Sequence, residues 1–110
     1  MADGRALFDR VCNQLVQENE HIQIGKMMSS PGLQYKKKNF AFFHENHLVV
    51  KLGREHPPHA YGIQEYRLLA PFKTKAPLQD WFMIPPEYAD RWAEVAQIAL
   101  SRMIVQVDGD

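Results

Sequence analysis

The sequence has little cysteine, no long apolar run and no net charge, and each shortage excludes a class of protein. Its single cysteine, Cys12, excludes an internal disulfide, and no CxxC pair of the kind found in structural zinc sites occurs. No apolar run approaches the roughly 18 residues of a membrane span, and the first residues lack the apolar segment of a signal peptide. We therefore expect a cytoplasmic protein with no membrane partner.

Charge is balanced overall but unevenly placed along the chain. The 110 residues carry a formal net charge of zero, so the chain lacks the global basic excess that would by itself suggest nucleic acid. Residues 21–79 nevertheless hold nine basic and three acidic residues, a net +6, between flanking segments of net −2 and −4. A chain of this length with 45% hydrophobic residues can form one core, and we predict a single domain over residues 1–110.

Hydrophobic periodicity predicts the order of the elements. Apolar spacings of three and four residues predict one helix that ends near Glu18 and another from residue 86 to about 103. Alternation and β-rich composition predict strands over 22–28, 35–44, 47–52, 69–73 and 80–84, with a turn at 29–32, a hairpin turn at Glu45-Asn46 and a weak helix over 60–68. The predicted fold class is α+β, in the order α-β(3)-α-β(2)-α, with helices mainly on one face of an antiparallel sheet and a frayed tail at 107–110.

Two strand segments are apolar on both of their alternating faces. These segments are 40–43 and 81–84, whereas a strand covered by helices on one side only usually alternates with polar residues. We therefore expect a terminal segment or another chain to cover the second face of the sheet. The candidate interaction-surface residues are Phe43, Trp81 and Phe82.

Several short motifs resemble those of the TfoX N-terminal domain family, which looks related to the MmcQ/YjbR proteins. The matching segments span roughly residues 5–103 and are Gly25-Lys26-Met27, Ser30-Pro31-Gly32-Leu33, Phe40-Ala41-Phe42, residues 48–52, residues 77–81, Pro85-Pro86 and residues 92–96. The resemblance implies a fold like that of type III secretion chaperones, with the element order predicted above. It implies little about activity, because the family is named for competence regulators in which this domain is joined to a second, C-terminal domain. The chain departs from the usual pattern at Met28-Ser29 and at 56–59.

The basic middle segment predicts possible contact with nucleic acid. The candidate residues are Lys36, Lys37, Lys38, Arg54, Lys73 and Lys75, with Lys26 adding to the charge. Tyr35, Phe40 and Phe43 lie among them and offer aromatic rings that can stack on bases. The alternative is a solvated, positively charged hairpin that discourages pairing between strand edges. Lys51 alternates with Val50 and Leu52 and should point away from the core, toward an anionic ligand or into water.

The histidines, the cysteine and the second tryptophan are weaker candidates for a functional site. His44 and His47 flank the predicted hairpin turn, so their β-carbons should lie about 5 Å apart, close enough to share a metal with help from His56 and His59. The alternative is two exposed hairpin histidines and two loop histidines. Cys12 and Trp92 fall on apolar helical stripes, where core packing is expected for both.

We predict a non-enzymatic interaction module with no catalytic residue and no cofactor. The sequence contains no paired acid and base, no nucleophile with a partner and no phosphate-binding glycine loop. The first hypothesis is a module that forms a homodimer or docks a protein through the apolar strands. The alternative is a nucleic-acid-binding protein that uses the basic segment 21–79.

Overall fold

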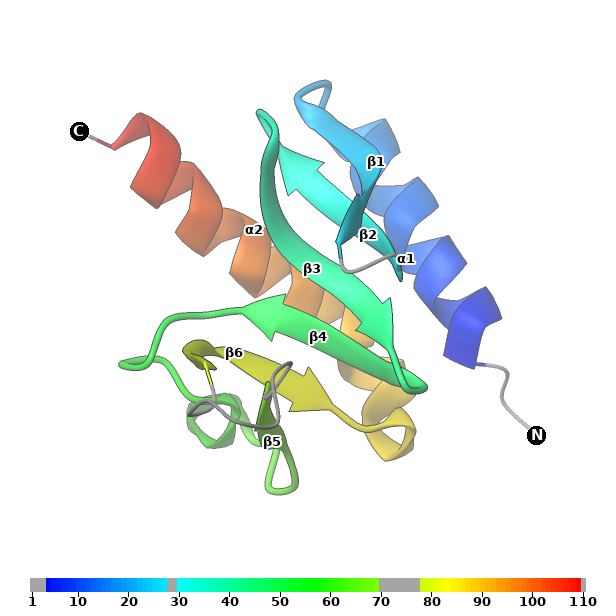
Figure 1. Cartoon of the computed structure of the whole chain (residues 1–110), viewed down its shortest axis with the longest axis vertical. Helices are drawn as coiled ribbons and strands as arrows, with labels where there is room; N and C mark the ends of the chain where they lie inside the picture. Colours follow the sequence, from blue (N-terminus) through cyan, green and yellow to red (C-terminus); the bar gives the residue numbers. More distant parts are fainter. Residues whose placement is uncertain (1–3, 28–29, 70–77, 110) are drawn as a thin grey trace.

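The computed structural model describes residues 4–27, 30–69 and 78–109 of the chain. Its elements are α1 (Gly4–Glu18), β1 (Ile22–Met27), β2 (Ser30–Tyr35), β3 (Lys38–His44), β4 (His47–Lys51), the 3-10 turn η1 (Pro58–Tyr61), β5 (Arg67–Leu69), β6 (Leu78–Ile84), the 3-10 turn η2 (Pro86–Arg91) and α2 (Trp92–Asp108). The α+β class is confirmed (Figure 1).

One antiparallel sheet contains all six strands, in the order β1-β2-β3-β4-β6-β5. The prediction of five strands was wrong, because part of the Pro-Gly segment expected as a turn forms β2. Gly32 pairs with Gly25 on one side and Phe42 on the other. A β-carbon at Gly32 would lie 3.0 Å from the Ala41 carbonyl oxygen, so glycine serves here for close strand approach rather than for a turn.

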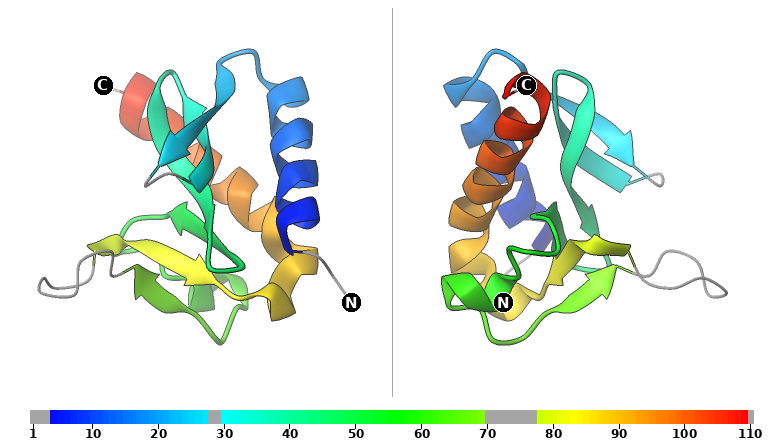
Figure 2. Two further views of the ribbon diagram at one scale, coloured as in Figure 1. Left: turned by 45° about the vertical axis from the view of Figure 1, so that its right-hand side comes forward. Right: turned by 90° about the vertical axis from the view of Figure 1, so that its left-hand side faces the viewer.

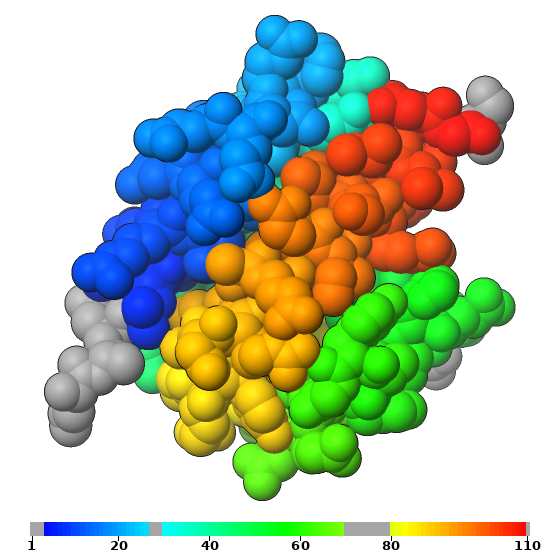
Figure 3. Space-filling view, turned by 180° about the vertical axis from the view of Figure 1, so that it is seen from behind, coloured from blue at the N-terminus to red at the C-terminus, as the bar shows by residue number. Residues whose placement is uncertain are grey.

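Both helices pack against the same face of the sheet, as predicted (Figure 2). They run side by side across that face in the view from behind, where α1 is blue and α2 orange to red (Figure 3). Strand alternation sends Leu48, Val50 and Leu52 toward the helices, where they join one large core. Neither described helix combines the length and the apolarity that a membrane crossing requires.

The opposite face of the sheet carries a smaller apolar cluster of its own. It consists of Phe42, Val49, Leu69, Trp81 and Met83, all buried. This placement corrects the predicted interaction surface, because Phe82 lies in the core on the helix side and Phe43 packs against that core. Of the three candidates only Trp81 faces the second side, and it is 9% exposed. The three side chains therefore do not form one surface.

Element boundaries differ from prediction near the two 3-10 turns and at the C-terminus. The helix expected from residue 86 begins only at Trp92, because residues 86–91 form η2. The helix expected over 60–68 is the single turn η1, which ends at Tyr61 and is capped by Gly62 in the left-handed conformation with φ 87°. The strand expected over 69–73 is the shorter β5, and residues 70–73 lie outside the described residues. The frayed tail expected at 107–110 was wrong for 107 and 108, because α2 continues to Asp108.

Two tight hairpin turns place non-glycine residues in the left-handed region. Glu45 and Asn46 connect β3 to β4 with φ of 49° and 62°, which confirms the predicted turn. Lys36 and Lys37 connect β2 to β3 with φ of 48° and 71°. The three-lysine run was predicted to continue as a strand, but two of its members form this turn.

Replacing Lys37 with glycine should stabilise the protein. The left-handed conformation costs a non-glycine residue about 1–2 kcal/mol, while the extra freedom of glycine in the unfolded chain costs about 0.5–1 kcal/mol. The net gain of about 0.5–1 kcal/mol should raise Tm by roughly 2–6 °C in differential scanning calorimetry. Lys38→Gly is the control of opposite sign, since Lys38 lies in a strand and the substitution should lower Tm. Equal shifts for both variants would contradict the assigned turn.

Candidate functional site

The sheet opens between β3 and β4 at one end. The two strands pair from Ala41 with Val50 to His44 with His47, and no pairing joins the residues before Ala41 to those after Val50. The opening begins at a bulge, because the β2–β3 register shifts between Leu33 and Gln34 and leaves Phe40 without a partner on β2. The strands diverge beyond this point with α2 behind them (Figure 1).

Two adjoining hollows occupy this opening and its rim. Their volumes are about 570 and 460 Å³, and they share Lys51, Met103 and Gln106. Lys38 and Asn39 line one hollow, and residues 52–53 and Asp80 line the other. The last turns of α2 therefore lie beside the ends of β3 and β4, and Figure 3 shows those turns next to the green segment that follows β4. We call the two together the basic hollow.

Cations from three elements line the basic hollow. They are Lys38 at the start of β3, Lys51 at the end of β4 and Arg102 on α2. In the part of the chain that the structure describes, the side chain of none of the three forms a hydrogen bond or an ion pair. A group of unpaired cations on a concave surface attracts anions.

Only part of this group could be found from the sequence. Lys38 was a candidate because of the three-lysine run, and Lys51 was expected to face away from the core. Arg102 was missed, because a single arginine on the polar face of a helix carries no sequence signal. Its neighbour at the next turn, Gln106, also lines the hollow, but only the packing of α2 against the sheet brings both there.

Arg54 stands beside the hollow but is already engaged. Its backbone N–H donates to Asp80 Oδ1 at 3.0 Å, and its Nε lies 3.5 Å from the same oxygen. The Asp80 backbone carbonyl also accepts from the N–H groups of residues 52 and 53, each at 3.1 Å. Asp80 therefore fixes the segment after β4, and the Arg54 side chain remains largely exposed. Lys73 and Lys75, the other predicted candidates, lie outside the described residues.

Asp108 ties the end of α2 to the lysine turn. Its carboxylate lies 2.8 Å from Lys36 Nζ and also accepts a hydrogen bond from the Tyr35 hydroxyl. The hydrogen bonds from Lys36 and Tyr35 lower the pKa of Asp108 below its ordinary value. The bond to Asp108 raises the pKa of Lys36 above its ordinary value. The positive charge of Lys36 is thus compensated by the Asp108 carboxylate, which leaves Lys37 and Lys38 as the cations of the run that form no ion pair among the described residues.

Stability should respond to Asp108 in a pH-dependent way. A carboxylate whose pKa is lower when folded stabilises the protein above its unfolded pKa, and that contribution is lost as pH falls through the folded pKa. Asp108→Asn should therefore lower the free energy of unfolding at neutral pH, and its difference from the parent should shrink as pH drops below about 3.8. Urea titrations across pH measure this difference. Glu65→Gln, an exposed carboxylate remote from Lys36, should show no such loss.

The aromatic residues of the basic segment are not available for stacking on bases. Tyr35 and Phe40 are buried in the helix-side core, and Phe43 packs against that core beside Phe8 and Trp92. Strand pairing and the bulge turn these rings inward, which corrects the expectation that they interleave with the lysines on one surface. Contact with an anion at this site must therefore come from the cations.

The predicted histidine pair forms but gathers no further metal ligand. His44 and His47 are cross-strand partners, as predicted. His47 Nδ1 lies 2.7 Å from the Glu45 backbone oxygen, and His59 Nδ1 lies 2.7 Å from the Tyr66 hydroxyl. Within residues 4–27, 30–69 and 78–109, no three histidine, cysteine or acidic side chains come close enough to hold a metal.

Cys12 lies on the buried face of α1. Burial, with a smaller effect from the charge of Asp9, raises the pKa of its thiol to about 12. A thiol with this pKa is protonated at neutral pH and is a poor nucleophile.

Comparison of the chain with family models, with curated proteins and with solved structures found no match. The resemblance to the TfoX N-terminal domain therefore stays a prediction.

Proposed function

We propose that the chain is a non-enzymatic binding module that holds the phosphate backbone of a nucleic acid in its basic hollow. The observation that carries this proposal is that Lys38, Lys51 and Arg102, from three separate elements, line one opening, and none of them forms an ion pair among the described residues. Two further cations adjoin the lining residues in the sequence, Lys37 next to Lys38 and Arg54 after residues 52–53.

The distribution of exposed apolar residues favours this function over docking of a protein through the sheet face opposite the helices. The apolar side chains on that face are buried within the chain. The large hydrophobic residues that stand exposed among those described are Ile24, Leu68 and Val105, on three different elements. An apolar docking site normally presents a contiguous patch of a few hundred Å².

The proposed binding is independent of base sequence. Phosphate contacts position a protein on nucleic acid but carry no sequence information, and the neighbouring aromatic rings are buried. Such binding is weak at physiological salt, with Kd on the order of 10⁻⁴–10⁻⁶ M, and depends steeply on salt because each contact releases counterions.

Fluorescence anisotropy with labelled duplexes of two unrelated sequences tests the proposal. We expect equal affinities for the two, and a slope of log Kobs against log salt of about −3 to −4.5, the value for three to five phosphate contacts. Absence of binding at low salt, or binding that salt leaves unchanged, would refute it. A strong preference for one duplex would contradict recognition by phosphates alone.

A further inference from the structure

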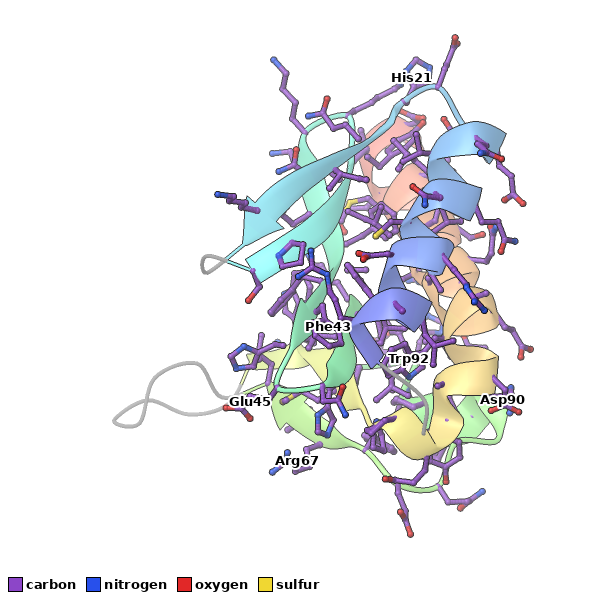
Figure 4. All side chains as sticks on the ribbon, turned by 90° about the vertical axis from the view of Figure 1, so that its right-hand side faces the viewer. His21, Phe43, Glu45, Arg67, Asp90 and Trp92 are labelled. Atoms are coloured by element: carbon purple, nitrogen blue, oxygen red, sulfur yellow. The ribbon has the colours of Figure 1, made fainter. Side chains whose placement is uncertain are left out.

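The two edges of the sheet differ in how well they are protected against pairing with another strand. β5 has three residues, a register shift between Leu68 and Leu69, and Arg67, all features that discourage a further strand. β1 has six residues in regular register with β2 and contains no proline. Its Ile24 side chain is 55% exposed. In the view of Figure 4, β1 lies at the front of the sheet with α1 beside it rather than across it.

The backbone of β1 presents hydrogen-bonding groups on its outer edge. The Lys36 N–H donates to the His21 carbonyl at 3.0 Å, and hydrogen-bonded pairs alternate along antiparallel strands. Gln23 and Gly25 therefore bond to β2, while Ile24 and Lys26 direct their N–H and C=O groups outward. The Ile22 carbonyl also points outward, and its N–H is already bonded to Asn19.

We infer that β1 pairs antiparallel with β1 of a second copy of this chain, joining two sheets across a twofold axis at Ile24. In this register Ile24 of each copy exchanges both backbone hydrogen bonds with Ile24 of the other, and the two exposed side chains cover one another. The Lys26 N–H donates to the Ile22 carbonyl of the other copy. All of the outward groups of Ile24 are then satisfied.

The charges along β1 favour a second copy of this chain as the pairing partner, and they favour antiparallel pairing. Glu20 precedes β1 and is almost fully exposed, and Lys26 lies near its other end. Antiparallel pairing brings Lys26 of one copy near Glu20 of the other, within the diagonal reach of long side chains. Parallel pairing would instead set Lys26 against Lys26 and Glu20 against Glu20. The strand is therefore complementary to itself in the antiparallel direction.

The test is the mass of the full-length protein by size-exclusion chromatography with light scattering, over a wide range of protein concentration and without nucleic acid. We expect the parent mass to rise from 12.8 kDa toward twice that value as concentration increases. Ile24→Lys places two like charges face to face at the axis and should weaken dimerisation at least tenfold. Leu68→Lys, the matched change on β5, should dimerise like the parent. Circular dichroism checks that both variants fold, which is expected because both side chains are exposed.

A charge exchange tests the register separately. Lys26→Glu alone should weaken the dimer by setting two acidic residues together, and the double variant Glu20→Lys/Lys26→Glu should restore it. A parent that stays at 12.8 kDa at every concentration would overturn the inference. So would an Ile24→Lys variant that dimerises as well as the parent, or a double variant no better than Lys26→Glu.

Discussion

Replacing Trp92 with alanine is expected to lower the free energy of unfolding by about 3–5 kcal/mol, the range for truncating a buried aromatic residue. Trp92 has no exposed surface and opens α2. Its indole Nε1–H donates to the Pro85 carbonyl at 3.3 Å, which joins the helix to the segment after β6. Its ring lies edge to face with that of Phe43 on β3, with 6.4 Å between the ring centroids (Figure 4). Phe43 in turn contacts Phe8 of α1.

The size of the effect follows from the position of Trp92 among three elements. Domains of this size are stable by about 5–15 kcal/mol, so the loss is about a fifth of the total or more. Guanidinium titration should show a lower midpoint with an unchanged slope. Val105→Ala is the control on the same helix, because Val105 is 61% exposed and its truncation should change stability by less than about 0.5 kcal/mol. A Trp92→Ala protein as stable as its parent would contradict the packing described.

Local patterns predicted the parts of the fold that depend on neighbours in the sequence. The apolar stripe of the last helix was predicted with six members: Trp92, Val95, Ala96, Ala99 and Met103 are buried, whereas Tyr88 is half-buried and lies in η2. The Glu45-Asn46 turn was predicted because asparagine tolerates a left-handed conformation. In both cases the determining contacts lie within a few residues of one another.

The parts that prediction missed depend on pairing between distant segments. Pro31-Gly32 has turn composition, but close approach of β1, β2 and β3 uses the missing side chain of Gly32 inside a strand. The end of α2 was expected to fray, but Asp108 meets Tyr35 and Lys36 from a hairpin more than seventy residues away. The basic hollow exists because a bulge at Phe40 lets β3 and β4 diverge over α2, and no local pattern encodes that divergence.

Neutralising the three cations of the basic hollow is the variant with the largest expected effect on function. An exposed charge pair at about 4 Å contributes about 1 kcal/mol in water, so Lys38→Gln/Lys51→Gln/Arg102→Gln should weaken duplex binding at low salt about 100-fold. The salt slope should also become shallower by about 2–3, because three counterion-releasing contacts are gone. Glutamine keeps much of the length of each side chain, and the three positions are not fully buried, so the fold should persist.

The decisive comparison is with a variant of the same net charge. Arg5→Gln/Arg10→Gln/Arg67→Gln removes three cations from α1 and β5, away from the basic hollow. If binding depended only on the net charge of the protein, the two triple variants would bind equally weakly, because each has lost three positive charges. Binding in the basic hollow instead predicts that the α1 and β5 variant keeps nearly the parent affinity and slope, while the hollow variant loses both. Equal losses would assign the interaction to net charge and would remove the basic hollow as a site.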